Sequence, residues 1–476
     1  MKEQEWDYRV EISGKRVLVV GAGRSGIGSV HLLNKVGAHP VLLEENASKE
    51  EDTIREALFA EDRDNTKIII GKLTKNDCED LCAAVISPGV PIDSGVVLML
   101  KENGIPVLSE VELAYRFMKG KLVAITGTNG KTTTTSLVGE ILKQTWRYGA
   151  EEVFVVGNIG ESFAMHALET TNNSVTVAEI SSFQLEAVER FHADVACILN
   201  ITPDHLDRHH NMETYVGLKE RVTINQRPKE GKTGLTDTCV LNRDDPYAAD
   251  FYENRYNGCA IWFSSTGPVP VGFWLDNDMI RLRCGSNDEA VIRPSESRLK
   301  GLCNTENIMA ALGIVLGLGI RPHLALDAIR GFQPVAHRIE YIATKNGVEY
   351  YNDSKATNPD SAIQGIKAMD RPTILIGGGY DKQSDYDAWT ALFEGRVKEL
   401  VLIGETADAI EKSARKNGFT NIHHAGSFEE ALAYSTTQAG RGDAVLLSPA
   451  CASWDMFQSY EERGDRFRDY CLSLAD

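Results

Sequence analysis

The chain has 476 residues, of which 42% are hydrophobic and 25% charged, the balance of an ordinary folded protein rather than a disordered or fibrous one. At roughly 150 residues per domain, this length predicts about three domains. The formal net charge of −18 argues against a general nucleic-acid-binding protein, because the bulk of the chain would repel phosphates. Any phosphate site must therefore be locally basic or assisted by a metal ion.

The cysteines and the apolar segments indicate the compartment. Nine cysteines without a C-x-x-C pair argue against a disulfide framework and against a thiolate zinc site. Residues 1–10 mix both charge signs without an apolar run, so we expect neither a signal peptide nor a transit peptide. The longest apolar stretch, residues 308–320, is too short to span a bilayer and predicts a buried helix. We expect a cytoplasmic protein that does not insert into membranes.

Short β-branched runs repeatedly end in Gly-rich turns followed by helical patterns, which is typical of parallel sheets with crossover helices. In chain order, strands are expected at residues 16–20, 40–43, 84–87, 105–107, 122–126, 174–180, 195–200, 373–376, 399–403 and 443–447. We predict an α/β fold of three consecutive domains: an N-terminal Rossmann-like domain (1–110), a central P-loop ATPase-like domain (111–334) and a C-terminal Rossmann-like domain (335–476). The strand-like, turn-rich segment 237–293 is interpreted as an insertion in the central domain.

The first motif is a Gly-rich turn at residues 21–26, Gly-Ala-Gly-Arg-Ser-Gly, between an expected strand and a helical pattern. Glu44 and Glu45 stand at the end of the next strand. Glycines allow the backbone to approach a pyrophosphate, and a helix N-terminus supplies positive charge. The motif predicts a nucleotide-diphosphate site, with a plain βα turn as the alternative. It does not distinguish NAD from a nucleotide sugar.

The second motif is a phosphate-binding loop that follows the expected strand 122–126 and precedes a helix. Its residues are Gly127, Thr128, Asn129, Gly130, Lys131, Thr132 and Thr133. In such loops the backbone N–H groups surround phosphates, the lysine neutralises their oxygens, and the hydroxyl after it binds Mg²⁺. Ile125 stands where the usual pattern has its first glycine, which indicates an unusual P-loop subclass.

The third motif, residues 179–185, ends a strand that we place two strands from the P-loop in the same sheet. A carboxylate at that edge, Glu179, is positioned for the Mg²⁺ of bound ATP. The alternative is an acidic residue that merely favours the start of a helix.

The histidines of segment 200–210 follow another strand. His205 and His209 have the i, i+4 spacing of a metal pair on a helix, but Pro203 indicates a loop or a short helix start instead. His205 could join Glu179 at Mg²⁺, although this ion prefers oxygen ligands. We expect His209 and His210 to be solvated.

Polar clusters also follow or flank the expected strands of the last third, at residues 336–338, 352–359, 377–382 and 448–457. In a parallel sheet they would gather at one edge. Their lysines, threonine and serines suit a small dicarboxylate, whereas each cluster alone could be ordinary loop solvation.

Residues 127–133, 179–185, 204–207 with Lys219 downstream, and 352–359 together resemble the Mur ligases of bacterial cell-wall synthesis, over nearly the whole chain. The run Asp-Ser-Lys-Ala-Thr-Asn at 353–358 is similar to that of the member that adds D-glutamate. This resemblance implies that ATP phosphorylates the carboxylate of UDP-N-acetylmuramoyl-L-alanine. The amine of D-glutamate then attacks the acyl phosphate, and ADP and phosphate are the other products.

The resemblance also implies roles for individual residues. For ATP they are the loop residues 127–133 with Asn304, Asn307, Arg338, Asp353 and Lys355. For the UDP-substrate they are Ser25, Gly26, Glu44, Ser87, Pro88, Gly89, Asn158 and His205, and for D-glutamate Thr357, Lys382, Ser448 and Phe457. The implied catalytic residues are Lys131, Glu179, His205 and Lys219, and the ligands of a pair of Mg²⁺ ions are Thr132, Glu179, His205 and Lys219.

The resemblance bears on Lys219 and on Cys303. Lys219 lies in the expected helix 213–226 and taken alone would be an exposed helix lysine, but the family carries a carbamylated lysine there. An ammonium beside Mg²⁺ would be repelled, whereas a carbamate formed from CO₂ adds negative oxygens. Cys303 stands where the family usually has histidine.

Other functions remain as alternatives at this point. An NAD-dependent dehydrogenase would use residues 21–26 and Glu44 but leaves the P-loop unexplained. A P-loop switch or motor protein, a family ligase for another amino acid and a folate-type polyglutamate ligase are further alternatives. We expect a monomer whose partners are small-molecule substrates and not nucleic acids.

Overall fold

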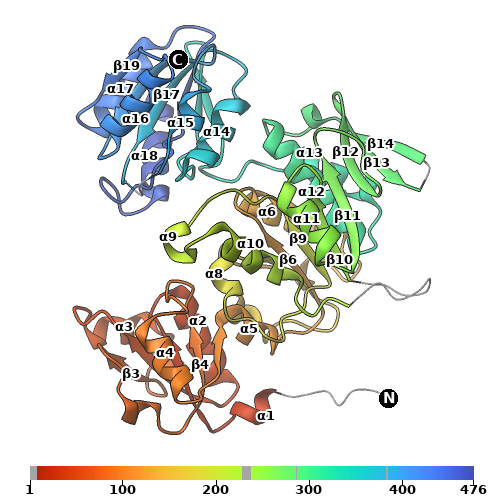
Figure 1. Cartoon of the computed structure of the whole chain (residues 1–476), viewed down its shortest axis with the longest axis vertical. Helices are drawn as coiled ribbons and strands as arrows, with labels where there is room; N and C mark the ends of the chain where they lie inside the picture. Colours follow the sequence, from red (N-terminus) through yellow and green to blue (C-terminus); the bar gives the residue numbers. More distant parts are fainter. Residues whose placement is uncertain (1–7, 228–236, 286, 382–383, 476) are drawn as a thin grey trace. The chain divides into compact units, whose positions relative to one another are not determined.

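The computed structural model describes residues 8–227, 237–285, 287–381 and 384–475 (Figure 1). Three sheets of five, nine and six strands follow one another along the chain. This arrangement confirms the predicted α/β fold with three consecutive domains. The chain divides into two compact units, one of Met1–Val291 with Ile308–Ile329 and one of Ile292–Asn307 with Arg330–Asp476. The domain boundaries near residues 110 and 334 stay predictions.

The N-terminal sheet is parallel throughout and has the order β3-β2-β1-β4-β5. Its strands are β1 (Arg16–Val20), β2 (His39–Glu44), β3 (Lys67–Ile70), β4 (Leu81–Ile86) and β5 (Val107–Ser109), and the helices of this region are α1 (Tyr8–Ile12), α2 (Arg24–Lys35), α3 (Glu51–Ala57) and α4 (Gly95–Glu102). Because β1 and β4 are neighbours, the turns that follow them lie at one edge. The prediction of a strand at 105–107 was wrong in its bounds: β5 begins only after Pro106, which has no N–H to donate.

The central sheet has the order β14-β13-β12-β11-β10-β9-β6-β8-β7. Its strands are β6 (Lys121–Thr126), β7 (Val153–Gly157), β8 (Val175–Glu179), β9 (Val195–Ile198), β10 (Thr238–Asn242), β11 (Cys259–Ser264), β12 (Gly272–Asp276), β13 (Met279–Cys284) and β14 (Asn287–Ile292). The strand of Glu179 is the direct neighbour of the P-loop strand, with Ile125 opposite Glu179, and not two strands away as predicted. The reason is that β7 adds to the far side of β8. The strand-rich segment 237–293 continues this sheet beyond β9.

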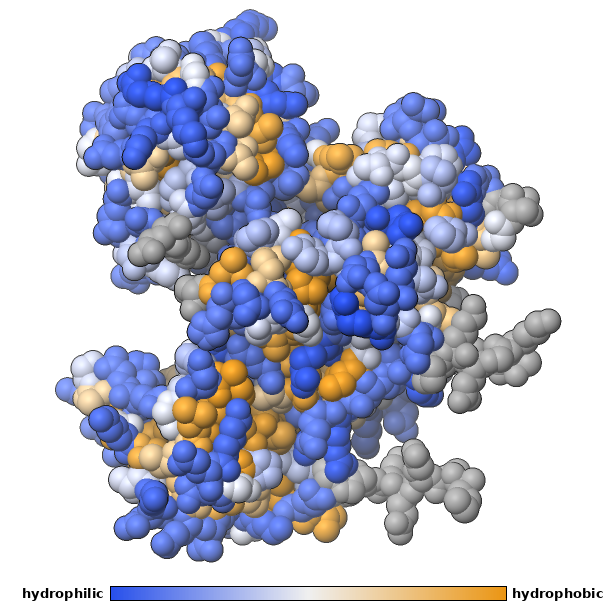
Figure 2. All heavy atoms as spheres, viewed as in Figure 1, coloured by the Kyte–Doolittle hydropathy of each residue, from blue (hydrophilic) through white to orange (hydrophobic). Residues whose placement is uncertain are grey.

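The helices of the central region are α5 (Glu110–Tyr115), α6 (Lys131–Thr145), α7 (Phe163–His166), α8 (Ser182–Leu185), α9 (Leu206–His209), α10 (Met212–Glu220), α11 (Pro246–Asn254), α12 (Leu302–Gly317) and α13 (Leu326–Gly331). The apolar stretch 308–320 supplies most of α12, and Ile308, Leu312 and Val315 are buried there, which confirms the predicted buried helix. No helix among the described residues is both long and apolar enough to cross a bilayer. On the face shown in Figure 2, hydrophilic side chains cover most of the surface.

The C-terminal sheet has the order β15-β16-β20-β17-β18-β19 and is parallel except for β15. Its strands are β15 (Glu340–Lys345), β16 (Val348–Asn352), β17 (Thr373–Gly378), β18 (Val397–Ile403), β19 (Ile422–His424) and β20 (Ala444–Leu447), and its helices are α14 (Pro359–Ala368), α15 (Asp387–Thr390), α16 (Ala407–Lys416), α17 (Phe428–Gln438) and α18 (Tyr460–Ser473). Strands β16, β20 and β17 are adjacent and parallel, so the segments that follow them meet at one edge. This confirms the predicted gathering of the polar clusters 352–359, 377–382 and 448–457 for their described residues, which do not include Lys382.

Candidate active site

The P-loop connects β6 to α6 in the conformation that its glycines allow. Gly127 has φ 150° and Gly130 φ 84°, values that side-chain-bearing residues rarely adopt. A Cβ on Gly127 would also lie 3.0 Å from the Cβ of Leu199. The ammonium of Lys131 donates to the carbonyl oxygens of Gly127 and Thr128, at 2.9 and 2.8 Å. The lysine is therefore held over the loop where phosphate charge is expected.

Two residues that the sequence analysis did not select hold this loop in place. Asn200 accepts the backbone N–H of Asn129 at 2.8 Å and donates to its carbonyl oxygen at 3.1 Å. The hydroxyl of Tyr215 lies 3.0 Å from that of Thr128. A signal was present for both, because Asn200 is the last residue of the expected strand 195–200 and Tyr215 precedes Lys219 by one helical turn.

Glu179 ends β8 and is 1% exposed. One of its carboxylate oxygens accepts a hydrogen bond from the side-chain amide of Asn158 at 3.0 Å. The other oxygen is buried and has no hydrogen-bond partner among the described residues. A buried carboxylate oxygen without a partner is unfavourable, and a divalent cation would satisfy it. Thr132 lies in the first turn of α6, which follows the adjacent strand β6, and its hydroxyl is a second oxygen ligand for such a cation. These residues fit Mg²⁺.

Lys219 is not the exposed helix lysine that its position alone suggests. It is 2% exposed on α10, donates to the carbonyl oxygen of Gly127 at 2.8 Å, and lies 4.5 Å from the ring centroid of Tyr215. Burial, together with the nearby charge of Lys131, holds the pKa of the Lys219 amine well below its usual value. The expected helix 213–226 is also shorter in the structure, since α10 ends at Glu220 and a 3-10 turn follows.

The histidine segment forms α9, and His205 precedes this helix with a left-handed backbone, φ 53°. Its ring lies against Phe183, with centroids 4.8 Å apart, and its side chain is 41% exposed. The prediction that His209 is solvated was wrong. His209 is 2% exposed and its Nε2 lies 3.0 Å from the Ser182 hydroxyl, because the short helix turns it inward against Phe183. His210 is exposed, as expected.

The N-terminal Gly-rich turn packs directly against the turn after β4. A Cβ on Gly26 would lie only 1.8 Å from the carbonyl oxygen of Gly21, so a side chain cannot be placed there. The hydroxyl of Ser87 donates to the same carbonyl at 3.3 Å. The structure thus brings together Ser25 and Gly26, at the start of α2, with the 87–89 turn. Glu44 accepts hydrogen bonds from the backbone of Asn46 and from Lys49.

In the C-terminal unit, Asp353 is the centre of a buried polar network. One of its oxygens accepts the N–H of Ile339 at 3.2 Å and the other accepts the hydroxyl of Ser448 at 2.8 Å. Burial raises the pKa of Asp353 to about 6, although the charge of Arg338 opposes the shift. Ser448 and Asp353 are both fully buried, so Ser448 contacts the carboxylate before any ligand binds.

Arg463 is a further residue that the sequence analysis missed. It is 1% exposed on α18 and donates to the hydroxyl and carbonyl oxygens of Ser354 and to the carbonyl of Cys451. It therefore ties the segment after β16 to the segment after β20. Its signal was an arginine in line with the buried Phe467 and Cys471, at spacings of four and eight residues.

The C-terminal unit, which includes residues 292–307, also contains the other predicted ATP and D-glutamate residues. Asn304 and Asn307 are buried near the start of α12, with a side-chain hydrogen bond of 3.0 Å between them. Burial raises the pKa of the neighbouring Cys303 thiol to about 12, so this cysteine is neutral. Lys355 and Thr357 are half-buried, and Phe457 is largely buried against Phe428. Lys382 lies outside the described residues.

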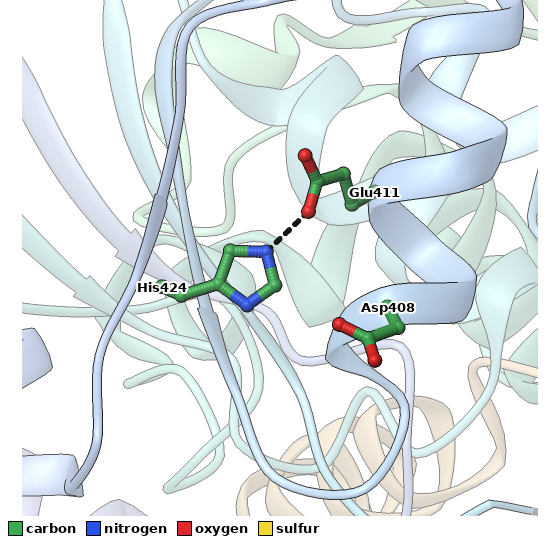
Figure 3. Close-up of side chains that lie close together, drawn as sticks. All are labelled: Asp408, Glu411 and His424. Atoms are coloured by element: carbon green, nitrogen blue, oxygen red, sulfur yellow. Dashed lines mark hydrogen bonds and ion pairs between the residues drawn. The ribbon is translucent and has the colours of Figure 1, made fainter.

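A separate cluster at the surface consists of Asp408 and Glu411 on α16 and His424 on β19 (Figure 3). Their ligand atoms lie within 4.8 Å of one another. Glu411 already pairs with His424 at 2.5 Å and with Arg415 at 2.6 Å. We interpret the cluster as a surface ion pair, and it shares no residue with the predicted Mg²⁺ ligands.

A strand, a Gly-rich loop and a helix, with a lysine over the loop and a buried carboxylate on the adjacent strand, define a nucleotide-binding protein of the P-loop class. Residues 125–315 match the Mur ligase middle domain, and residues 337–451 match the Mur ligase glutamate ligase domain. The chain belongs to the Mur ligase family.

Curated relatives match over nearly the whole chain. The UDP-N-acetylmuramoylalanine--D-glutamate ligase of Lachnospira eligens is 49% identical over 98% of this chain and 100% of its own length. The protein of the same name from Clostridioides difficile is 42% identical over 98% of this chain and 100% of its own.

Solved structures share the fold at low sequence identity. A pseudomurein peptide ligase type C from Methanothermus fervidus has a TM-score of 0.58 at 19% identity, covering 96% of this chain and 100% of that one. The UDP-N-acetylmuramate-alanine ligase of Thermotoga maritima has a TM-score of 0.58 at 16% identity, covering 96% and 99%.

Proposed function

We propose that the chain is an ATP-dependent ligase that joins D-glutamate to UDP-N-acetylmuramoyl-L-alanine in peptidoglycan precursor synthesis. Relatives of up to 49% identity and matching length carry that name. The structural observation that carries the proposal is the unpartnered oxygen of Glu179 on the strand next to the P-loop. We place the enzyme in the cytoplasm as a monomer that acts on small molecules.

The chain's own residues would act by positioning and by neutralising charge. Lys131 and the loop amides hold the phosphates of ATP while the muramoyl carboxylate oxygen attacks the γ-phosphorus, and ADP leaves. The amine of D-glutamate attacks the carbonyl carbon of the acyl phosphate and loses a proton, and the C–O bond to phosphate breaks. A pair of Mg²⁺ ions, held by Thr132, Glu179, His205 and modified Lys219, supplies further neutralisation of phosphate charge.

The other substrate contacts that we propose are those that the family resemblance implies. The packed turns 21–26 and 87–89 hold the uridine diphosphate, with Glu44 and Asn158 also toward this substrate. Asn304, Asn307, Arg338, Asp353 and Lys355 contribute to ATP, and Thr357, Lys382, Ser448 and Phe457 to D-glutamate. Asp353 and Ser448 are buried in one hydrogen-bonded network, which holds both side chains in place before a ligand binds.

We propose that Lys219 is carbamylated. Burial lowers the pKa of the Lys219 amine and so favours its neutral form, which can attack CO₂ and release a proton to give a carbamate. Intact mass in bicarbonate buffer should show one added CO₂, which Lys219→Ala should lack and the exposed-site control Lys143→Ala should retain. Lys219→Ala should also lose most turnover. Near-normal turnover in that variant would remove Lys219 from the site.

One assay tests the proposed reaction against its rivals. The protein is given UDP-N-acetylmuramoyl-L-alanine, ATP and Mg²⁺ with either D-glutamate or L-glutamate, and ADP and product are measured. We expect product and ADP only with the D form. Product with L-glutamate alone would contradict the specificity, and ADP release that is indifferent to the amine would favour a switch or motor protein.

A further inference from the structure

Arg208, on α9, contacts two segments that lie far from it and from each other in the sequence. One guanidinium nitrogen donates to the carbonyl oxygen of Pro88 at 2.8 Å, and another donates to that of Val90 at 2.9 Å. The same group pairs with the carboxylate of Glu186 at 3.2 and 2.7 Å. It also lies 4.3 Å from the ring centroid of Phe183. The arginine thus joins the turn after β4 to the segment after β8 and to its own helix.

The contacts of Arg208 are shielded from solvent. The side chain of Arg208 is 14% exposed and that of Glu186 only 4%. Glu186 also lies 3.6 Å from the Nδ1 of the buried His209. A guanidinium that donates to two carbonyls and a buried carboxylate uses several of its five donors in a fixed fork, which a lysine cannot reproduce.

The segments that Arg208 joins belong to two different predicted binding regions. The 87–90 turn packs on the Gly-rich turn 21–26, which we assign to the nucleotide substrate. Glu186 follows the segment that begins with Glu179, and Arg208 is three residues from His205. We assign Glu179 and His205 to the metal site. Arg208 can therefore transmit a change in the 87–90 turn to the segment that contains His205.

We infer that Arg208 is a positioning residue that couples occupation of the 87–90 turn by the nucleotide substrate to ordering of the segment 203–211. This inference rests on the proposed function for the identity of that substrate. Because coupling between sites is reciprocal, an ordered His205 segment also favours binding of the nucleotide substrate. An arginine that served only to hold the fold together would show no such dependence on ligand.

Hydrogen exchange of the 203–211 backbone tests the coupling without ATP, Mg²⁺ or turnover. Saturating UDP-N-acetylmuramoyl-L-alanine should slow exchange in the wild type by about fivefold or more. Arg208→Lys should bind the substrate more weakly and, when saturated, show little slowing. A second variant, Glu186→Gln, weakens the support of Arg208 and should give an intermediate slowing. Thermal unfolding without ligand shows that each variant is folded.

His210→Ala is the matched control. His210 bridges the same two regions by a 3.5 Å contact to Asp93, but both side chains are more than half exposed. This variant should keep the slowing of the wild type, since exposed ion pairs contribute little. Equal slowing in wild type and Arg208→Lys would overturn the inference, as would the absence of slowing in a wild type that binds the substrate. Failure of the wild type to bind it or to use D-glutamate would instead refute the proposed function.

Discussion

The P-loop region and the Asp353 network treat buried polar groups in opposite ways. Around the P-loop, Glu179 has an oxygen without a partner among the described residues, and Lys219 is a buried amine with a depressed pKa. In the C-terminal unit, both oxygens of Asp353 are hydrogen-bonded by the chain, and Arg463 satisfies Ser354. The first region thus leaves bonding capacity open for ligands, whereas the second is complete before they arrive.

The largest expected effect is on activity in the P-loop region. Lys131→Ala removes the ammonium held over the loop and should lower kcat/KM for ATP by about 10² to 10³-fold or more, because phosphate charge is then less neutralised. Steady-state kinetics of the variant and of Lys143→Ala, an exposed lysine on the same helix, measure this. A kcat/KM of Lys131→Ala within twofold of the wild-type value would show that Lys131 does not neutralise phosphate charge.

Glu179→Gln separates ligand binding from folding. Adding Mg²⁺ in the presence of ATP should raise the Tm of the wild type further but not that of the variant, because the carboxylate that would bind the cation is gone. Without ligands, the unfolding free energy of the variant should be within about 1 kcal/mol of that of the wild type. The replaced oxygen makes no hydrogen bond among the described residues, so none is lost. Equal stabilisation of both proteins by Mg²⁺ would show that Glu179 does not bind metal.

Ser448→Ala should behave in the opposite way and destabilise the ligand-free protein. It leaves a buried oxygen of Asp353 without its partner, at about 1 to 3 kcal/mol of unfolding free energy. The pKa of folded Asp353, about 6, lies above its usual value, so its contribution to stability is present below pH 4 and is lost as pH rises through 6. The Ser448 hydroxyl donates to this carboxylate and favours its ionised form, so Ser448→Ala should lose more unfolding free energy at pH 8 than at pH 4 in denaturant unfolding. If Ser448→Ala lowered the unfolding free energy only with ligands bound, the C-terminal network would not differ from the P-loop region in this respect.

The smallest effect is expected at the surface cluster of Asp408, Glu411 and His424 (Figure 3). His424→Ala should change neither Tm nor turnover measurably, because the side chains of His424 and Glu411 are 42% and 26% exposed and solvent screens their ion pair (Figure 3). Adding Zn²⁺ or a chelator should likewise leave the thermal unfolding of the wild type unchanged. A Zn²⁺-dependent rise in Tm that His424→Ala abolishes would identify a metal site instead.

Local sequence predicted the parts of the site that depend on local geometry. The loop 127–133 and its helix follow from glycines at positive φ, and the edge position of Glu179 follows from strand pairing. Strand order is not local, so the direct pairing of β6 and β8 was missed. The burial of His209 depends on the packing of the short helix α9 against Phe183, which a periodic pattern does not reveal. Arg463 has the helical spacing of the buried Phe467 and Cys471, but its hydrogen bonds to two distant segments do not follow from that spacing.

The transfer of oxygen from substrate to phosphate tests the central claim most directly. UDP-N-acetylmuramoyl-L-alanine is labelled with ¹⁸O in its carboxylate and incubated with ATP, Mg²⁺, D-glutamate and the protein. If ATP activates this carboxylate as an acyl phosphate, each turnover places one labelled oxygen in the released inorganic phosphate. Unlabelled phosphate alongside amide product would contradict acyl-phosphate activation by this enzyme.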